Sequence, residues 1–425
     1  MAAPSSRDPA ALMDELVEEC LLRLPPEDPA DLARAALVSK QWHRVVTGAI
    51  FRRRYIEFHR SAPLLGYMLN QDNNSIRFVP TSSFRPPQVD RRDVRAIHSR
   101  HGRVLLLSAR EREGDGLRLL VWDPRKDKQW ELPVLQPGSR IANWDAALAC
   151  AVGDGCSHLD CHFKVIFVGR SGGRRFSCFY SSEADSWSDP IFVSEKGGYV
   201  AYGMYKSVLV GNAFYFKIGG SDGIFKLDLQ THQICRISLG VSPPSLLIAT
   251  EDGSMLGVAK IIINPTLCVW LREQGRWVES RLIQLRALLP DDALCDPLLP
   301  PQTNIDKPSV VAFSETGAGV IFLRTCVGYF TIDLNSGRSK KVGNVVLGSG
   351  HIVPYVSFCT PAPGTVSTDA GPGASGVVSS DDEPGAGVVV SRDEGLGDVV
   401  VSTDEGSGHV LVSTDEGPGP SMSSA

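Results

Sequence analysis

The chain has 425 residues, of which 43% are hydrophobic, and a formal net charge of −5. This length exceeds that of a typical single domain, and the apolar content is sufficient for packed cores, which excludes a wholly disordered chain. No basic and apolar leader opens the sequence and no apolar run is long enough to span a bilayer, so we expect neither secretion nor a membrane contact, and a location in the cytoplasm or nucleus.

The first predicted element is an amphipathic helix. Its acidic and basic residues occupy one face, and its apolar residues recur at steps of three and four on the other face. The prolines Pro25 and Pro26 predict its end, because neither can donate a backbone hydrogen bond. The predicted apolar stripe consists of Leu12, Leu16, Val17, Cys20, Leu21 and Leu24.

Two more short helices are predicted after this one. Asp28 is suited to cap the second helix, with Pro29 at its first position. Gly48 is the predicted end of the third helix. The predicted apolar sides are Leu32, Ala33, Ala36 and Leu37 in the second helix, and Trp42, Val45 and Val46 in the third.

Three short helices are close to the lower size limit of an independent core, so we expect part of their apolar surface to need a partner. The alternative is an ordinary helical subdomain that packs on its own chain. Three segments resemble the F-box family: Leu21-Leu22-Arg23-Leu24-Pro25-Pro26, Leu37-Val38-Ser39-Lys40-Gln41-Trp42 and Phe51-Arg52-Arg53-Arg54.

The resemblance implies an F-box over residues 8–60 that binds a Skp-type adaptor and, through it, the cullin of a ubiquitin ligase. Two positions depart from the family pattern, since Leu12-Met13 replaces the opening Leu-Pro and Ser39 replaces the usual Cys. The residues implied to bind the adaptor are Leu12, Leu16, Leu21, Leu24, Pro25, Leu37, Val38 and Trp42.

Residues 61–360 are predicted to be rich in β-strands with a recurring unit. An apolar strand ends at a polar turn, and about six residues later the next strand begins, with turn residues at 123, 181, 228, 271 and 333. A glycine followed by an apolar run precedes several of these strands, at Gly102, Gly211 and Gly319. Each period holds about four strands, which is the content of one blade of a β-propeller.

Five blades are explicit, and a sixth can be assembled if the strand around Phe78 joins the last strand, Val353–Phe358. This pairing would close the ring and remove exposed sheet edges. A pair of stacked β-sandwiches is the alternative fold. The segments 58–60, 63–66, 77–80 and 353–358 look like those of grass-type plant F-box proteins with a kelch-like, F-box-associated β-propeller. The expected fold class is therefore α+β multidomain, with a three-helix F-box, an all-β propeller of about six blades and a tail.

The tail, residues 361–425, contains one basic and eleven acidic residues, and thus carries −10 while the rest carries +5. Val-Ser-x-Asp units begin at Val366, Val378, Val390, Val401 and Val412. Such short Gly-, Ser- and Asp-rich units cannot bury enough apolar surface to offset the entropy of ordering, so we predict disorder. The mild positive charge of the remainder does not indicate nucleic-acid binding.

No motif predicts a cofactor, a metal or a catalytic site. Ten cysteines without a framework spacing suit reduced thiols, and the group Cys156, His158, Cys161 and His162 is interpreted as hairpin-loop residues. Gly169-x-Ser171-x-Gly173 fits a nucleophile elbow, but the alternating residues after it favour a strand over the helix that an elbow requires.

The sequence thus predicts a non-catalytic substrate receptor of an SCF-type (Skp–cullin–F-box) ubiquitin ligase with an unknown target protein. The alternatives are an F-box scaffold that delivers nothing for degradation, and a propeller hydrolase or sugar-binding protein.

Overall fold

The computed structural model describes most of the chain between residues 14 and 361. The described residues are 14–109, 116–136, 138, 140–151, 156, 161–193, 199–200, 207–219, 223–238, 245–250, 252–262, 265–294, 307–314, 319–344 and 351–361. They all fall within one compact unit, Met1–Ser367. Leu12, His158 and the tail beyond Pro361, with its predicted disorder, lie outside the described residues.

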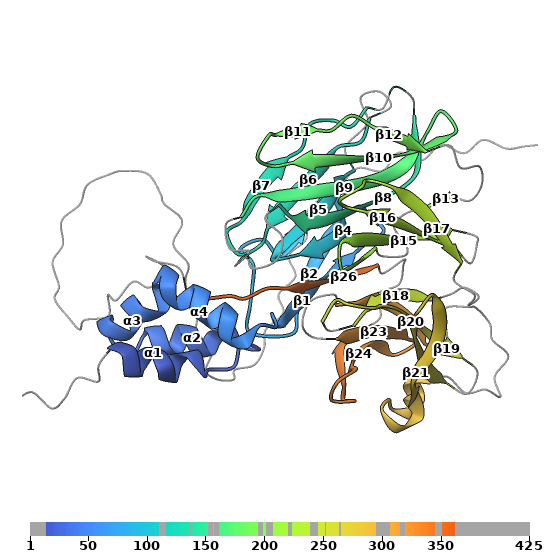
Figure 1. The fold of residues 1–425 in the computed structure, drawn as a ribbon. Helices are drawn as coiled ribbons and strands as arrows, with labels where there is room; N and C mark the ends of the chain where they lie inside the picture. The colour runs from blue at the N-terminus through green and yellow to red at the C-terminus, as the bar shows by residue number, and fades with distance from the viewer. Residues whose placement is uncertain are drawn as a thin grey trace, which may run out of the picture. The chain divides into compact units, whose positions relative to one another are not determined.

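Four helices come first: α1 (Asp14–Leu22), α2 (Pro29–Ala36), α3 (Lys40–Thr47) and α4 (Ala49–His59) (Figure 1). The predicted cap is confirmed, because the Asp28 carboxylate accepts the N–H of Ala30 at 3.1 Å, with Pro29 at the helix start. Ser39 caps α3 by accepting the N–H of Trp42 at 3.1 Å. Gly48 ends α3 as predicted, and α4, a fourth helix beyond the three expected, starts directly after it.

The predicted apolar stripes are only partly buried. In α1 the core side is formed by Val17, Leu21 and Leu22, whereas Leu16 and Cys20 are exposed. In α2 the predicted Ala33 is exposed, and Ala35 is buried in its place. Two-turn helices turn only a narrow face toward a small core, so part of each apolar stripe stays exposed, in line with the expectation that some of this surface needs a partner.

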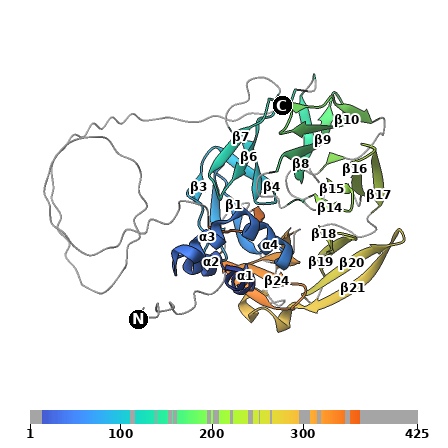
Figure 2. The same ribbon diagram turned by 60° about the vertical axis from the view of Figure 1, so that its left-hand side comes forward.

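The β region forms six antiparallel sheets, which we call blades 1 to 6 in chain order, and it confirms the propeller over the sandwich alternative. Figure 2 shows the blades following one another around a ring. Blade 1 contains β26 (Ile352–Val356), β1 (Leu64–Asn70), β2 (Ile76–Pro80) and β3 (Asp90–Arg91); blade 2 contains β4 (Val94–Arg100), β5 (Arg103–Ser108), β6 (Leu119–Asp123) and β7 (Lys128–Glu131); blade 3 contains β8 (Ile141–Cys150), β9 (Phe163–Ser171), β10 (Arg174–Ser181), β11 (Ser186–Trp187) and β12 (Ile191–Val193).

The second half of the ring repeats this pattern. Blade 4 contains β13 (Tyr199–Val200), β14 (Val208–Val210), β15 (Ala213–Gly219), β16 (Gly223–Asp228) and β17 (Ile234–Ser238); blade 5 contains β18 (Leu246–Ala249), β19 (Leu256–Ile262), β20 (Thr266–Glu273) and β21 (Arg276–Gln284); blade 6 contains β22 (Ser309–Phe313), β23 (Val320–Thr325), β24 (Gly328–Asp333) and β25 (Ser339–Gly343). The single turns η1 (Leu285–Ala287) and η2 (Asp291–Ala293) follow β21.

The ring closes through strands from both ends of the β region, as the sequence predicted. Strand β1 pairs with β2 on one side, with Met68 opposite Phe78, and with β26 on the other, with Met68 opposite Val353. Blade 1 therefore joins residues far apart in the chain, and the pairing covers the edge that β1 would otherwise expose.

The predicted turn residues lie at the ends of the third strands. Asp123, Ser181, Asp228 and Asp333 are each the last residue of such a strand. In blade 5 the strand runs on to Glu273, two residues beyond the predicted turn at Leu271. A Gln-Gly turn at 274–275 with positive φ at both residues makes this hairpin instead.

The glycine before the second strand has a conformational role. Gly102, Gly211 and Gly319 all have positive φ, the region that favours glycine. At Gly102 a Cβ atom would also lie 2.6 Å from the Ser357 hydroxyl, so this hydroxyl would have to move to make room for a side chain.

The propeller core lies between neighbouring blades. Five apolar clusters join blades 1 and 2, blades 2 and 3, blades 3 and 4, blades 4 to 6, and blades 6 and 1. Each blade thus buries both of its faces, which explains why strands such as β6 are buried along their whole length.

The helices share their core with the end of the propeller chain. Phe358, just after β26, is 9% exposed and belongs to the apolar cluster of the helices. A polar contact links the two parts as well, since the Ala30 N–H donates to the Ser83 hydroxyl at 3.1 Å and Ser83 donates to Asp28. The members of this helical core are Val17, Leu21, Leu22, Leu32, Ala35, Ala36, Val46, Phe51, Tyr55 and Phe358.

Candidate functional site

Exposed apolar side chains are concentrated on the four helices. Within the described part of the chain, ten large apolar residues are exposed, and five of them lie in the short stretch between residues 16 and 58. Such a concentration is typical of a surface that binds a partner. The five are Leu16 (52% exposed), Leu37 (63%), Val38 (64%), Ile50 (66%) and Phe58 (52%).

The helices hold these residues on a fixed frame. Tyr55 is 1% exposed and its hydroxyl donates to the carbonyl of Leu24 at 2.8 Å, which ties α4 to the segment after α1. Helix α3 packs against α1, α2 and α4. Leu37 and Val38 lie in the turn that leads from α2 into α3, so their positions are set by two packed helices.

Ion pairs between α1 and α4 strengthen this frame. Arg54 contacts Glu18 at 2.8 Å and Glu19 at 2.7 Å, and the charge of Glu18 raises the pKa of the Arg54 guanidinium. Arg53 pairs with Glu57 at 3.9 Å, and both side chains are about two-thirds exposed. The run Arg52-Arg53-Arg54 therefore combines a solvent-exposed arginine, Arg53, with one that links α1 and α4, Arg54.

The residues implied to bind the adaptor occupy three environments. Leu16, Pro25, Leu37 and Val38 are exposed, whereas Leu24 and Trp42 are half-buried against the helical core. Leu21 is 2% exposed and lies inside that core. Leu12 lies outside the described residues.

Sequence reasoning missed Ile50 and Phe58. The signal was available, because Phe51 and Tyr55 are spaced by four and are buried, which places Ile50 one residue off their stripe. Phe58 continues the stripe by spacing, but α4 extends past the edge of the small core there, and the side chain remains 52% exposed.

The propeller carries a large hollow where strands and turns of blades 2 to 5 meet. Its volume is about 990 Å³ and its wall is mixed in character, with Arg100, Lys164, Trp187, His232 and Asp252 among the lining residues. A second hollow of about 690 Å³ also includes Asp252, and Arg60 from the end of α4 contributes to its wall. Arg60 at its rim means that this hollow lies on the side of the propeller that meets the helices.

The nucleophile-elbow motif is a hairpin, as predicted. Ser171 ends β9 and pairs with Arg174 at the start of β10, and Gly172 and Gly173 between them have positive φ. An elbow requires a helix directly after its serine, and a strand stands there.

Among the helices of the described part, none combines the length and the apolar content that crossing a bilayer requires.

Comparison with known protein families identifies the helical region. Residues 12–54 match the F-box domain family, so these helices form an F-box domain. No curated protein matches the chain.

Three solved structures show limited similarity to the chain. TolB from Acinetobacter baumannii is 11% identical with a TM-score of 0.40, over 69% of this chain and 65% of that one. A mitotic checkpoint complex matches at 14% identity and 0.32, over 60% and 64%. A mutant of the GH43 protein BlXynB from Bacillus licheniformis matches at 12% and 0.31, over 73% and 60%. The chain thus spans about 60 to 65% of the length of these three chains.

Proposed function

We propose that this protein is the substrate-recognition subunit of an SCF-type ubiquitin ligase. The observation that carries the proposal is the pairing of an F-box domain at residues 12–54 with a closed six-blade propeller in one chain. This architecture fits a substrate receptor and is typical of non-catalytic proteins. The resemblance of segments 58–60, 63–66, 77–80 and 353–358 to grass-type F-box-associated propellers supports the same interpretation.

The F-box domain binds a Skp-type adaptor in this proposal. Leu16, Leu37 and Val38 supply exposed apolar area to this interface, and Leu24 and Trp42 contribute the exposed parts of half-buried side chains. Leu21, inside the helical core, supports the surface from behind. The adaptor connects the chain to a cullin, and we place the complex in the cytoplasm or nucleus.

The propeller presents a target protein to the ligase. Loops on a rigid frame are the usual carriers of recognition, and the hollow of about 990 Å³ offers a mixed polar and aromatic wall for a target segment. The receptor acts by proximity alone, because it raises the effective concentration of the target's lysines near the ubiquitin-loaded enzyme. No cofactor and no reacting side chain is needed for this role.

Affinity purification of the full chain from cells treated with a proteasome inhibitor tests the proposal. We expect a Skp-type adaptor, a cullin and a target protein that carries ubiquitin to co-purify. The variant Leu16→Asp should lose the adaptor and the cullin but keep the target. If the adaptor and the cullin co-purify but no other protein accumulates under the inhibitor, the scaffold alternative is favoured. If neither the adaptor nor the cullin co-purifies, the proposal is contradicted.

A further inference from the structure

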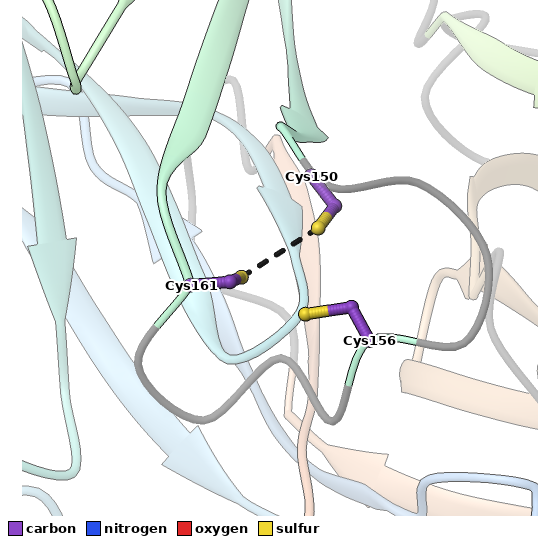
Figure 3. Close-up of side chains that lie close together, drawn as sticks. All are labelled: Cys150, Cys156 and Cys161. Carbon is purple, nitrogen blue, oxygen red and sulfur yellow. Dashed lines mark hydrogen bonds between the residues drawn. The ribbon is translucent and has the colours of Figure 1, made fainter.

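The connection between β8 and β9 brings three cysteine side chains together. Cys150 is the last residue of β8, Cys161 lies two residues before β9, and Cys156 comes from the connection itself. Their sulfur atoms all lie within 4.8 Å of one another. Figure 3 shows the three thiol groups pointing toward a common centre. The sequence predicts that Cys156 and Cys161 are hairpin-loop residues, and Cys150, six residues before Cys156, is the strand residue that joins them.

The spacing of the sulfur atoms suits a metal ion. Zinc binds thiolates at about 2.3 Å, which places the ligands of a tetrahedral site about 3.8 Å apart. The Sγ atoms of Cys150 and Cys161 are 3.6 Å apart. This separation is far longer than a disulfide bond of about 2 Å. A disulfide would also need only two of the three thiols, whereas a metal uses all of them.

A buried cation stands beside the sulfur atoms. Arg103 of blade 2 is 4% exposed, and its guanidinium donates to the Cys161 carbonyl at 2.6 Å and to the Cys161 sulfur at 3.5 Å. The aromatic rings of Phe163 and Trp130 lie against it at 5.3 and 5.8 Å. Among the described residues, no carboxylate forms an ion pair with this guanidinium.

A buried charge is costly without a counter-charge. Thiolates supply such a charge, and the thiolate is the form of cysteine that binds metals. The site therefore has both its ligands and a group that holds one of them in place. Soft thiolate ligands select zinc over magnesium or calcium, which prefer oxygen.

We propose that Cys150, Cys156 and Cys161 bind a zinc ion through three thiolates, with the fourth position taken by a nitrogen or oxygen ligand. The ion fixes the β8–β9 connection at both ends and in its middle. Cys150 and Ala151 also line the hollow of about 990 Å³, so the ion shapes one wall of this hollow. This inference does not depend on the ligase function, because it concerns a structural metal in the propeller.

Metal analysis of the full chain, purified under reducing conditions with zinc and washed with a weak chelator, tests the proposal. We expect one zinc ion per chain. Substituting cobalt should give the intense thiolate-to-cobalt charge-transfer absorption and the d–d bands of a tetrahedral site. Each of Cys150→Ser, Cys156→Ser and Cys161→Ser should release the ion at chelator concentrations that the unmodified chain withstands.

Matched controls separate the site from general effects. Cys235→Ser makes the same change at an exposed cysteine on β17 and should retain the zinc. Arg103→Met should weaken zinc binding about 10- to 100-fold, as expected for a group that orients a ligand. Arg175→Met removes an arginine that is equally buried, at 5% exposure, over Phe225, and should leave zinc binding unchanged.

Cys156 lies in a connection and outside the strands, so its variant should keep the far-UV circular dichroism of the unmodified chain. A folded Cys156→Ser chain that keeps its zinc and its cobalt spectrum would overturn the proposal. So would a freshly isolated chain without zinc in which mass spectrometry finds Cys150 and Cys161 joined by a disulfide.

Discussion

Tyr55 of α4 and Phe358 beyond β26 meet edge to face, with ring centroids 6.2 Å apart and ring planes at 79°. Tyr55 belongs to the last of the four N-terminal helices, and Phe358 lies two residues beyond the strand that closes the propeller. The contact between the two aromatic rings therefore couples the stability of the four helices to the completion of the ring.

Removing this contact should destabilise the F-box domain. Phe358 is 9% exposed, and truncating a buried phenylalanine to alanine typically costs about 3 to 5 kcal/mol. We expect Phe358→Ala to lower the melting temperature and to make the helices more sensitive to limited proteolysis. Phe58→Ala makes the same change at a residue that is 52% exposed and should cost about 0.5 kcal/mol or less. Equal effects of the two variants would contradict the shared core.

Adaptor binding should depend on Leu16. Burying an apolar anchor at an interface is commonly worth about 2 kcal/mol or more, which is roughly thirtyfold in affinity. Leu16 is 52% exposed, so Leu16→Asp should reduce adaptor binding at least to this extent without unfolding the helices. Leu282→Asp on β21 introduces the same charge at a site that is 54% exposed. This control variant should bind the adaptor as tightly as the unmodified chain. Isothermal titration with a purified Skp-type adaptor measures both.

A fragment that lacks residues 1–60 should separate the two activities. It retains all six blades, so we expect it to capture the target but not the adaptor, and to lengthen the half-life of the target in cells by occupying it. Because Phe358 loses its cover in this fragment, Phe358→Ser is included to limit aggregation. Target binding with an unchanged half-life would favour a scaffold.

Stability should show a pH dependence that originates at Asp145. This residue lies in β8 at 4% exposure, and burial raises the pKa of its carboxyl from 3.8 to about 8. Between these values the folded chain holds a proton that the unfolded chain has released, so the free energy of unfolding falls as the pH rises from about 4 to about 8. Asp145→Asn removes this titration and keeps an acceptor for the Ala146 N–H, which donates at 2.8 Å.

The gain in stability of Asp145→Asn over the unmodified chain should therefore be larger at about pH 8 than at about pH 5. Urea unfolding at both values measures it. Asp252→Asn is the control, because hydrogen bonds from Ser254 and Thr250 lower the pKa of Asp252 to about 2, and its contribution is lost only as the pH falls from 3.8 to that value. A pH-independent difference for Asp145→Asn would show that burial does not hold its proton.

The tail should contribute little to stability. The sequence of residues 361–425 predicts no packed structure, and segments of this kind add little to global unfolding energy. A chain that ends at Pro361 should melt within about a degree of the full chain. A large decrease, measured by differential scanning calorimetry, would mean that the repeats pack on the folded part.

Local sequence patterns predicted most of the fold. The cap at Asp28, the end of α3 at Gly48 and the turns after the third strands follow from backbone preferences that a sequence displays directly. Ring closure was predictable because the edge strands of blade 1 each needed a partner. The burial of Ala35 in place of Ala33 was not predictable from the sequence, because helix packing decides which residues of α2 face the core.

The candidate sites were harder to predict for the same reason. An apolar stripe does not by itself separate exposed members such as Leu16 and Leu37 from buried ones such as Leu21, although the family resemblance implied that all three bind the adaptor. Cys150 stands six residues before Cys156, and only the return of the chain at β9 brings it beside Cys161. Arg103 comes from another blade altogether, so no local pattern could connect it with these sulfur atoms.

The placement of Phe358 also bears on synthesis of the chain. On the ribosome the F-box helices emerge first, but their core stays one aromatic ring short until residue 358 has left the exit tunnel, and blade 1 lacks β26 until the same moment. A nascent or prematurely terminated chain thus has an incomplete F-box and an open ring together. The same few residues at the end of the β region therefore complete both the core of the helices and blade 1.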